Sequence, residues 1–298
     1  MQIYALILVQ ILANGVGLTA QKKYQQAAYP GMRSHLLYLG MTGLTALLFF
    51  SASAGFRLQI NAITLGFSFV YAAVVAGSLV FRFLAMAHMN VLLLTLYSNA
   101  GIMLLPVLFG AVVYQEPIGP WLLVGLVLMT ASILFPLWDQ RGSCHGTLRG
   151  NLYGVVLFLI SGLSTILSKV YTRTPGVCDN NSYCFFTNLL LLAGVLTVLL
   201  CTLRRRPPQD EVQPGLREVF APRQVVRILV NTAASNLTTI LTLIILQDMA
   251  LSVYTMLSNA LNMAGTVTVS RLVFREKITR SQLCSAVCAL LAVLCSLL

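Results

Sequence analysis

The segment MNVLLLTLYSNAGIMLLPVLFGAVVYQEPIGPWLLVGLVLMTASIL, residues 89–134, is the stretch that decides the fold. It matches residues 249–294 at a constant offset of 160 positions without a gap, and the triplet Ser-Asn-Ala recurs in register. Chance matches among apolar residues are common, but a polar pair such as Asn99 and Asn259 at the same offset is not. The sequence therefore predicts an internal duplication.

Around this segment, apolar runs long enough to cross a bilayer fill most of the chain. Of its 298 residues, 58% are hydrophobic and 9% are charged, whereas roughly 25% of residues are charged in soluble domains. This composition excludes a soluble enzyme. A crossing helix needs about 20 apolar residues, and continuous runs without alternating polarity exclude barrel strands. The predicted fold class is therefore all-α, a polytopic membrane protein with ten transmembrane helices. The runs fall near residues 3–20, 35–55, 62–86, 90–114, 119–138, 150–170, 183–203, 224–246, 249–273 and 278–298.

The duplication predicts two repeats of five helices each, residues 1–140 and residues 141–298. Because five is an odd number, the second repeat must enter the membrane in the opposite sense to the first. Inverted repeats of this kind are how many transporters build a binding site near the bilayer midplane and expose it alternately to each side. The charged connection at residues 138–145 is the predicted joint between the repeats.

Two motifs in the first repeat carry a resemblance to a known family. Residues 81–91 read FRFLAMAHMNV, and residues 112–135 read VVYQEPIGPWLLVGLVLMTASILF, in which an acidic residue closes the fourth run before a Gly-containing fifth. This pattern resembles the repeat of the drug/metabolite transporter superfamily, EamA-like branch, and residues 239–298 resemble its second copy. The resemblance implies ten helices in two fives that transport a small molecule. Thr266 stands where the first copy has Pro106, which is a departure from the pattern.

Polar side chains within apolar runs are expensive unless they face protein, water or substrate, so they map a candidate pathway. In the eighth run, four of them recur at steps of four, three and four and therefore share one helical face. Three polar or charged residues in the third run lie 160 positions earlier. The alternative for each hydroxyl is a hydrogen bond between helices, which contributes about 0.6 kcal/mol on average. The two stripes are Asn231, Ser235, Thr238 and Thr242 in the eighth run, and Tyr71, Ser78 and Arg82 in the third.

The fourth and ninth runs supply a second set of candidate substrate-binding residues. Their duplicated amides offer both donors and an acceptor, which suit hydroxyl, amide or carboxylate groups of a substrate. A neighbouring aromatic ring can stack on the apolar part of that substrate. The alternative is that the repeated triplet is a packing motif of small residues. The set comprises Tyr97, Asn99, Tyr254, Asn259 and Asn262.

Charged residues constrain the transport mechanism. All eight acidic residues lie at the ends of runs or in connections, so no buried central carboxylate is available for proton antiport. A facilitator or a substrate exchanger is therefore favoured. Glu116 and Glu276 are interpreted as structural residues paired with nearby basic side chains. Four cations near the pathway either extend to the interface or supply a counter-charge for an anionic substrate. They are Lys22, Arg82, Lys169 and Arg271.

The connections predict the orientation of the chain. Those after the odd-numbered runs carry 16 of the 19 Lys and Arg residues, so the positive-inside rule places them in the cytoplasm and both termini outside. Family analogy favours termini inside. Cys178 and Cys184 bracket a short stretch after the sixth run, where a disulfide is a candidate if that connection faces an oxidising space.

These observations favour a cell-membrane transporter of a small polar metabolite that works by alternating access, with substrate between the third, fourth, eighth and ninth runs. An alternative is a lipid-linked-sugar flippase or a nucleotide-sugar-like carrier of the same fold, because NALNM at 259–263 is weakly similar to the GALNK segment of nucleotide-sugar transporters. A third alternative is an obligate membrane partner without transport of its own. The expected partners are a small-molecule substrate and the bilayer, without nucleic acid, in a monomer or homodimer. Neither catalysis nor a cofactor is expected, and three scattered His residues predict no metal site.

Overall fold

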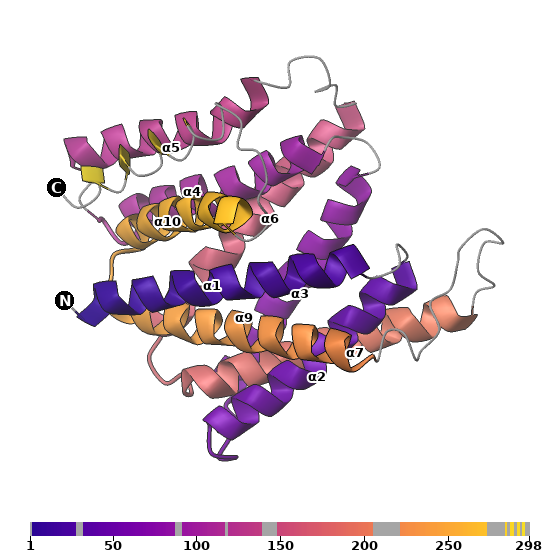
Figure 1. Ribbon diagram of the computed structural model, residues 1–298. Coiled ribbons are helices and arrows are strands. Elements are labelled where there is room, and N and C mark those ends of the chain that lie inside the picture. Colours follow the sequence, from indigo (N-terminus) through magenta and orange to yellow (C-terminus); the bar gives the residue numbers. More distant parts are fainter. Residues whose placement is uncertain are drawn as a thin grey trace. The chain divides into compact units, whose positions relative to one another are not determined.

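The computed structural model describes residues 2–27, 32–86, 91–116, 119–138, 148–204 and 221–272, together with seven residues between 284 and 295. Over these residues the chain is helical, without strands (Figure 1). The helices are α1 (Gln2–Ala27), α2 (Met32–Ser53), α3 (Ala62–Met86), α4 (Val91–Val113), α5 (Pro120–Trp138), α6 (Leu148–Arg173), α7 (Asn180–Arg204), α9 (Pro222–Asp248) and α10 (Leu251–Leu272).

The apolar runs of the sequence coincide with these helices, which confirms the all-α prediction. Five helices contain segments long and apolar enough to cross a membrane by length and composition, and three shorter apolar segments lie in α1, α4 and α5. Of the predicted tenth run, residues 278–298, only seven residues are described, and all seven are helical. The ten-helix, two-repeat arrangement therefore stays a prediction of the sequence. The five segments are Leu36–Ser53, Ala62–Arg82, Leu152–Arg173, Asn180–Cys201 and Pro222–Asp248.

Large apolar side chains are abundant on the surface of these helices. Leu12 of α1, Leu48 of α2, Phe69 of α3 and Val112 of α4 each expose more than three fifths of their surface. An extensive apolar surface marks a contact with lipid or with another protein. Because such residues lie on several helices at once, the surface fits a chain surrounded by the acyl tails of a bilayer.

The chain forms two compact units, each of which combines segments from both halves of the sequence. Unit 1 consists of Met1–Ile11, Ala73–Pro175 and Leu243–Leu298, and unit 2 consists of Leu12–Ala72 and Gly176–Thr242. The helices α1, α3 and α9 each contribute residues to both units. The division into repeats at residue 140 stays a prediction, since it concerns chain duplication and not compactness.

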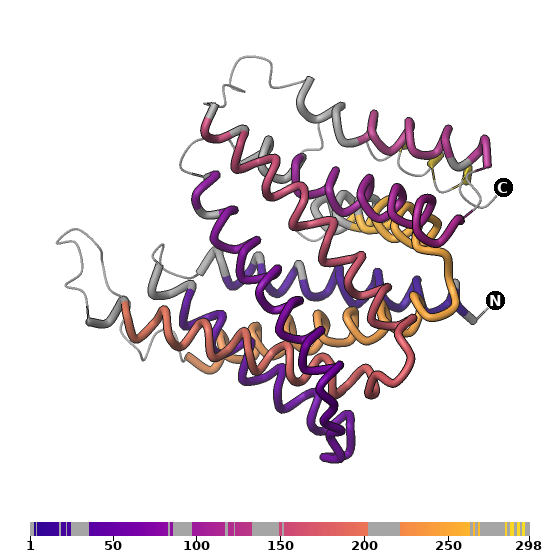
Figure 2. Tube along the Cα trace, turned by 180° about the vertical axis from the view of Figure 1, so that it is seen from behind, coloured from indigo at the N-terminus to yellow at the C-terminus, as the bar shows by residue number. Residues whose placement is uncertain are grey.

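In unit 1, α4 is the central helix: it packs on α6, on α5 and on α10. Both ribbon and tube views show α4 and α6 side by side (Figures 1 and 2). The contact depends on two glycines. A Cβ at Gly101 would overlap the backbone carbonyl of Phe158, and a Cβ at Gly162 would lie 2.5 Å from the carbonyl oxygen of Gly101. Small residues of this kind let membrane helices approach closely, so these two positions fix the α4–α6 contact.

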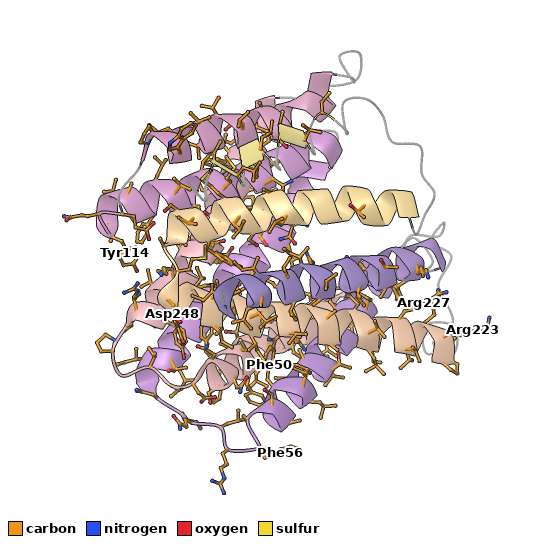
Figure 3. All side chains as sticks on the ribbon, turned by 60° about the vertical axis from the view of Figure 1, so that its left-hand side comes forward. Phe50, Phe56, Tyr114, Arg223, Arg227 and Asp248 are labelled. Carbon is orange, nitrogen blue, oxygen red and sulfur yellow. The ribbon has the colours of Figure 1, made fainter. Side chains whose placement is uncertain are left out.

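In unit 2, α2 packs on α7, and a small aromatic core joins three helices. Tyr24 of α1, Tyr38 of α2 and Ile228 of α9 form this core, with the two tyrosine rings 4.7 Å apart between centroids. Phe50, near the end of α2, is fully buried, whereas Phe56 in the following turn points outward with 77% of its surface exposed (Figure 3). The buried core therefore lies along the helices, and the turn after α2 projects away from it.

Candidate substrate site

Unit 1 contains a polar cluster that joins three helices, which we call the Arg82 cluster: Arg82 of α3, Ser98 of α4 and Ser161 of α6. The Arg82 Nη2 donates to the Ser98 Oγ at 3.4 Å, and the two serine hydroxyls lie 3.1 Å apart. Both serines are buried, with 4% and 6% of their surface exposed, whereas Arg82 is exposed. The close approach of α4 and α6 is what brings the two hydroxyls into contact.

Aromatic side chains lie beside this cluster. Tyr97, which precedes Ser98, packs with Tyr153 against the buried pair Ala85 and Leu157. The ring of Phe81, which precedes Arg82, lies 6.3 Å from that of Tyr153 between centroids. The cluster thus combines one charged group and two hydroxyls with an adjacent apolar and aromatic surface, a combination typical of small-molecule sites.

The duplicated amides of α4 and α10 are less buried than the two serines of the Arg82 cluster. Asn99 is exposed and Asn259 is half-buried. The Asn262 Nδ2 lies 3.4 Å from the Ser258 Oγ, one turn earlier on the same helix. Both helices belong to unit 1 and pack on each other, so the structure assigns Asn99 and Asn259 to contacting helices of the same unit.

Tyr254, also on α10, is buried and makes a long-range contact. Its hydroxyl accepts a hydrogen bond of 2.8 Å from the Gln10 Nε2 of α1. The sequence predicts that Tyr254 binds substrate. In the structure its hydroxyl already has a partner in α1, and this hydrogen bond joins two helices of unit 1.

In unit 2, two of the predicted site residues contact other helices. The Asn231 Nδ2 of α9 donates to the Tyr38 hydroxyl of α2. The ring of Tyr71 on α3 meets that of Tyr183 on α7 edge-on, with centroids 5.8 Å apart. Ser235, one turn beyond Asn231, is exposed. The stripe thus combines helix-to-helix contacts with exposed polar surface.

Hydroxyls of the two predicted stripes are largely satisfied by their own helices. Ser78 donates to the carbonyl oxygen of Val75 at 2.7 Å, and Thr238 donates to that of Ala234 at 2.9 Å. Thr242 donates to the carbonyl oxygen of Thr238, also at 2.9 Å. Serine and threonine can hide in apolar helices in this way, so their presence in a stripe does not by itself identify a pathway.

Four polar residues that are buried or that join helices were not predicted from the sequence: Gln10, Tyr38, Ser161 and Asn236. The first three join helices, as described above. Asn236 is 7% exposed, and its Nδ2 makes no hydrogen bond with any described residue. It lies one position after Ser235, off the step pattern of the eighth run, which is why the stripe excluded it. Ser161 would have emerged from a search of the sixth run for polar residues.

Lys169 of α6 is neither at an interface nor available to a substrate, which corrects both sequence interpretations. It is 1% exposed, and its Nζ donates to the carbonyl oxygens of Leu246 and Met249, each at 2.6 Å. These carbonyls lie at the end of α9 and just after it, where backbone oxygens lack helical partners and a cation is favoured by the helix dipole. Lys169 therefore caps α9.

Glu116 caps the start of α10 with a negative charge. Its Oε1 accepts the backbone N–H of Leu251 at 2.7 Å, and its Oε2 accepts the N–H and the hydroxyl of Ser252 at 3.0 and 2.6 Å. The structural interpretation of Glu116 is confirmed, and its hydrogen-bond partners among the described residues are these groups of α10. Tyr114 and Asp248, labelled in Figure 3, lie at this same end of unit 1.

Several other predicted features lie outside the described residues. Glu276 and the side chains of Lys22 and Arg271 belong to this group. Cys178 precedes α7 and Cys184 is buried within it, and their sulfurs are not joined in the structure. The disulfide, which depends on an oxidising compartment, stays a prediction of the sequence.

Comparison with known proteins adds a family and a fold. The family model described as "EamA-like transporter family" matches residues 148–298. No curated protein sequence matches the chain. A solved structure described only as "Crystal structure of protein" is similar over 99% of this chain and 96% of that chain, with a TM-score of 0.74 and 15% sequence identity. A likeness at that identity shows the fold alone.

Proposed function

Because this chain belongs to the EamA-like transporter family and is therefore a membrane transporter of the drug/metabolite type, we propose that it moves a small polar metabolite across the cell membrane by alternating access. The observation that carries this proposal is the Arg82 cluster, where α3, α4 and α6 bring a guanidinium and two buried hydroxyls together in mainly apolar helices. Intramembrane polar groups of this kind mark substrate pathways by default.

The proposed driving force is the substrate gradient, through facilitated diffusion or exchange. Among the described residues, the acidic side chains are Glu116, Asp179 and Asp248. Glu116 caps α10, Asp179 accepts the hydroxyl of Ser182 at the start of α7, and Asp248 ends α9. None of these three carboxylates lies in the middle of a helix, where a proton carrier driven by a buried carboxylate would need one.

Reconstitution in liposomes tests the proposal. Purified protein is inserted into vesicles, and uptake of radiolabelled metabolites (amino acids, hydroxy acids, sugars and nucleosides) is compared with that of protein-free vesicles. We expect saturable uptake of one class, and preloading the vesicles with that metabolite separates exchange from facilitation. Absence of uptake and of exchange for every class would contradict the proposal. Movement of a fluorescent lipid-linked sugar between leaflets would instead identify a flippase.

Variants at the duplicated amides separate transport from a partner role. Asn99→Leu and Asn259→Leu each remove donors and an acceptor while keeping a helix-compatible side chain. We expect both variants to reach the membrane and to lose at least part of the uptake. Unchanged uptake in both variants would exclude these amides from the substrate pathway.

A further inference from the structure

The charge at the Arg82 cluster points to the class of substrate, an inference that rests on the proposed function. We propose that Arg82, together with Ser98 and Ser161, binds a carboxylate, and that the transported metabolite is an organic anion with a single carboxylate at this site.

Among the described residues, no carboxylate compensates the charge of Arg82. A guanidinium stays charged in proteins, and an arginine in an apolar helix normally pairs with a carboxylate or lines an aqueous cavity. No carboxylate of the described residues lies within ion-pair distance of Arg82, whose contact is with the Ser98 hydroxyl. One N–H of five is engaged in that contact. The remaining donors form the planar fork that fits a carboxylate bidentately.

The Arg82 guanidinium lies against the hydroxyl of another helix. An arginine that extends to the interface carries its charge toward the nearer end of its helix. Arg82 instead contacts Ser98, whose hydroxyl meets that of Ser161. Ser161 lies 13 residues after the start of α6 and 12 before its end, hence about 20 Å and about 18 Å from the two ends. The exposed guanidinium, at the end of the apolar segment Ala62–Arg82, therefore bonds to a pair of hydroxyls that reaches the middle of α6.

The number of cations at the cluster limits the charge of the ligand. A dianionic phosphate buried in a membrane protein requires more than one cation to balance it. Lys169, which is the buried cation of unit 1 among the described residues, is committed to the carbonyl oxygens at the end of α9. One guanidinium with two hydroxyls balances a single negative charge, which is that of a carboxylate.

The duplicated sequence offers a position to compare with Arg82. The residue 160 positions after Arg82 is Thr242, whose hydroxyl bonds to the carbonyl oxygen of Thr238 in its own helix. The position that corresponds to Arg82 in the second copy therefore carries no charge. The duplicated fold therefore does not require a charge at this position, and a bound anion would give Arg82 a role there.

Uptake by proteoliposomes tests the proposal with matched probes. Radiolabelled lactate and lactamide share a skeleton and differ by the carboxylate, and inorganic phosphate serves as the dianionic probe. We expect lactate, but neither lactamide nor phosphate, to be taken up or to compete with the metabolite found in the panel. Equal competition by lactamide overturns the carboxylate assignment while leaving transport intact. If no panel metabolite is transported, the proposed function fails instead.

Variants of Arg82 supply the residue-level test. Arg82→Gln should raise KM for the carboxylate probe about 10- to 100-fold, as expected from loss of a hydrogen bond to a charged group. Arg82→Lys should recover part of this loss, because it keeps the charge without the fork. The matched control is Arg223→Gln at the exposed start of α9, labelled in Figure 3, which should leave KM unchanged. Unchanged KM in Arg82→Gln overturns the proposal, and the wild-type competition by lactate and lactamide decides it if that variant does not fold.

Discussion

The carboxylate of Glu116 accepts two hydrogen bonds from Ser252, one from its backbone N–H and one from its hydroxyl, although 136 residues separate them in the chain. On the other side of the short connection between α9 and α10, Lys169 binds the carbonyl oxygens of Leu246 and Met249. A negative group at a helix start and a positive group at a helix end both complement the helix dipole. The connection is thus held by charges of opposite sign from α6 and from the segment after α4.

Glu116→Gln is expected to lower the free energy of unfolding by about 1–2 kcal/mol, because a neutral amide loses the charge-assisted hydrogen bonds to the first turn of α10. Thermal unfolding in detergent measures the effect. The double variant with Ser252→Ala isolates the bond between carboxylate and hydroxyl: the two effects should be less than additive. Full additivity would show that this bond is not formed.

Lys169→Met is expected to destabilise the protein by about 1–3 kcal/mol, because it leaves buried carbonyl oxygens of α9 without a donor. The measurement is thermal unfolding alongside uptake at saturating substrate. A variant with wild-type stability but without substrate binding would restore Lys169 as a counter-charge for the substrate. Lys169→Arg should not rescue stability, since the site is 1% exposed and the guanidinium is larger.

Gly101→Ala is expected to destabilise the protein by about 1–3 kcal/mol, the range for overpacking in a filled core, because the new methyl group meets the backbone of α6. Gly194→Ala on α7 is the matched control, since a Cβ there has no atom within 4 Å. That substitution should be neutral or stabilising by up to about 1 kcal/mol, the helix propensity difference. Equal midpoints of thermal unfolding for the two variants would contradict the close contact of α4 and α6.

A cysteine introduced as Gln209→Cys in a variant without native cysteines tests the predicted orientation. The connection around it carries six of the 16 basic residues assigned to the cytoplasm. A membrane-impermeant maleimide added to intact cells should leave it unlabelled and should label it after permeabilisation. Labelling from outside would reverse the predicted orientation.

The helices were predictable because a membrane demands continuous apolar runs, and such runs have few other solutions. The ends of α3, for example, agree with its predicted run at residues 62–86. The contact made by Gly101 was not predictable, since its partner Phe158 lies in a helix that no local pattern connects to α4.

The candidate site was predictable in part. Arg82 was found because a charge in an apolar run is conspicuous, whereas Ser161 was missed because one serine in such a run is not. The role of Lys169 could not be predicted from its residue type, because an ammonium can bind either a carbonyl oxygen or a substrate anion. Its partners became clear only from the position of the end of α9 in the structure. Asn231 was predicted as a substrate-binding residue, whereas Tyr38, to whose hydroxyl it donates, carried no signal in the sequence.

The backbone contact at Gly101 and Gly162 also restricts how the molecule can move. Two helices that touch through their main chains clash if one slides past the other by a turn, so this contact favours movement of α4 and α6 together. In such a joint movement, Ser98 of α4 and Ser161 of α6 would stay 3.1 Å apart. If alternating access operates as proposed, release of the bound anion would require α3 to move the Arg82 guanidinium away from the hydroxyls of Ser98 and Ser161.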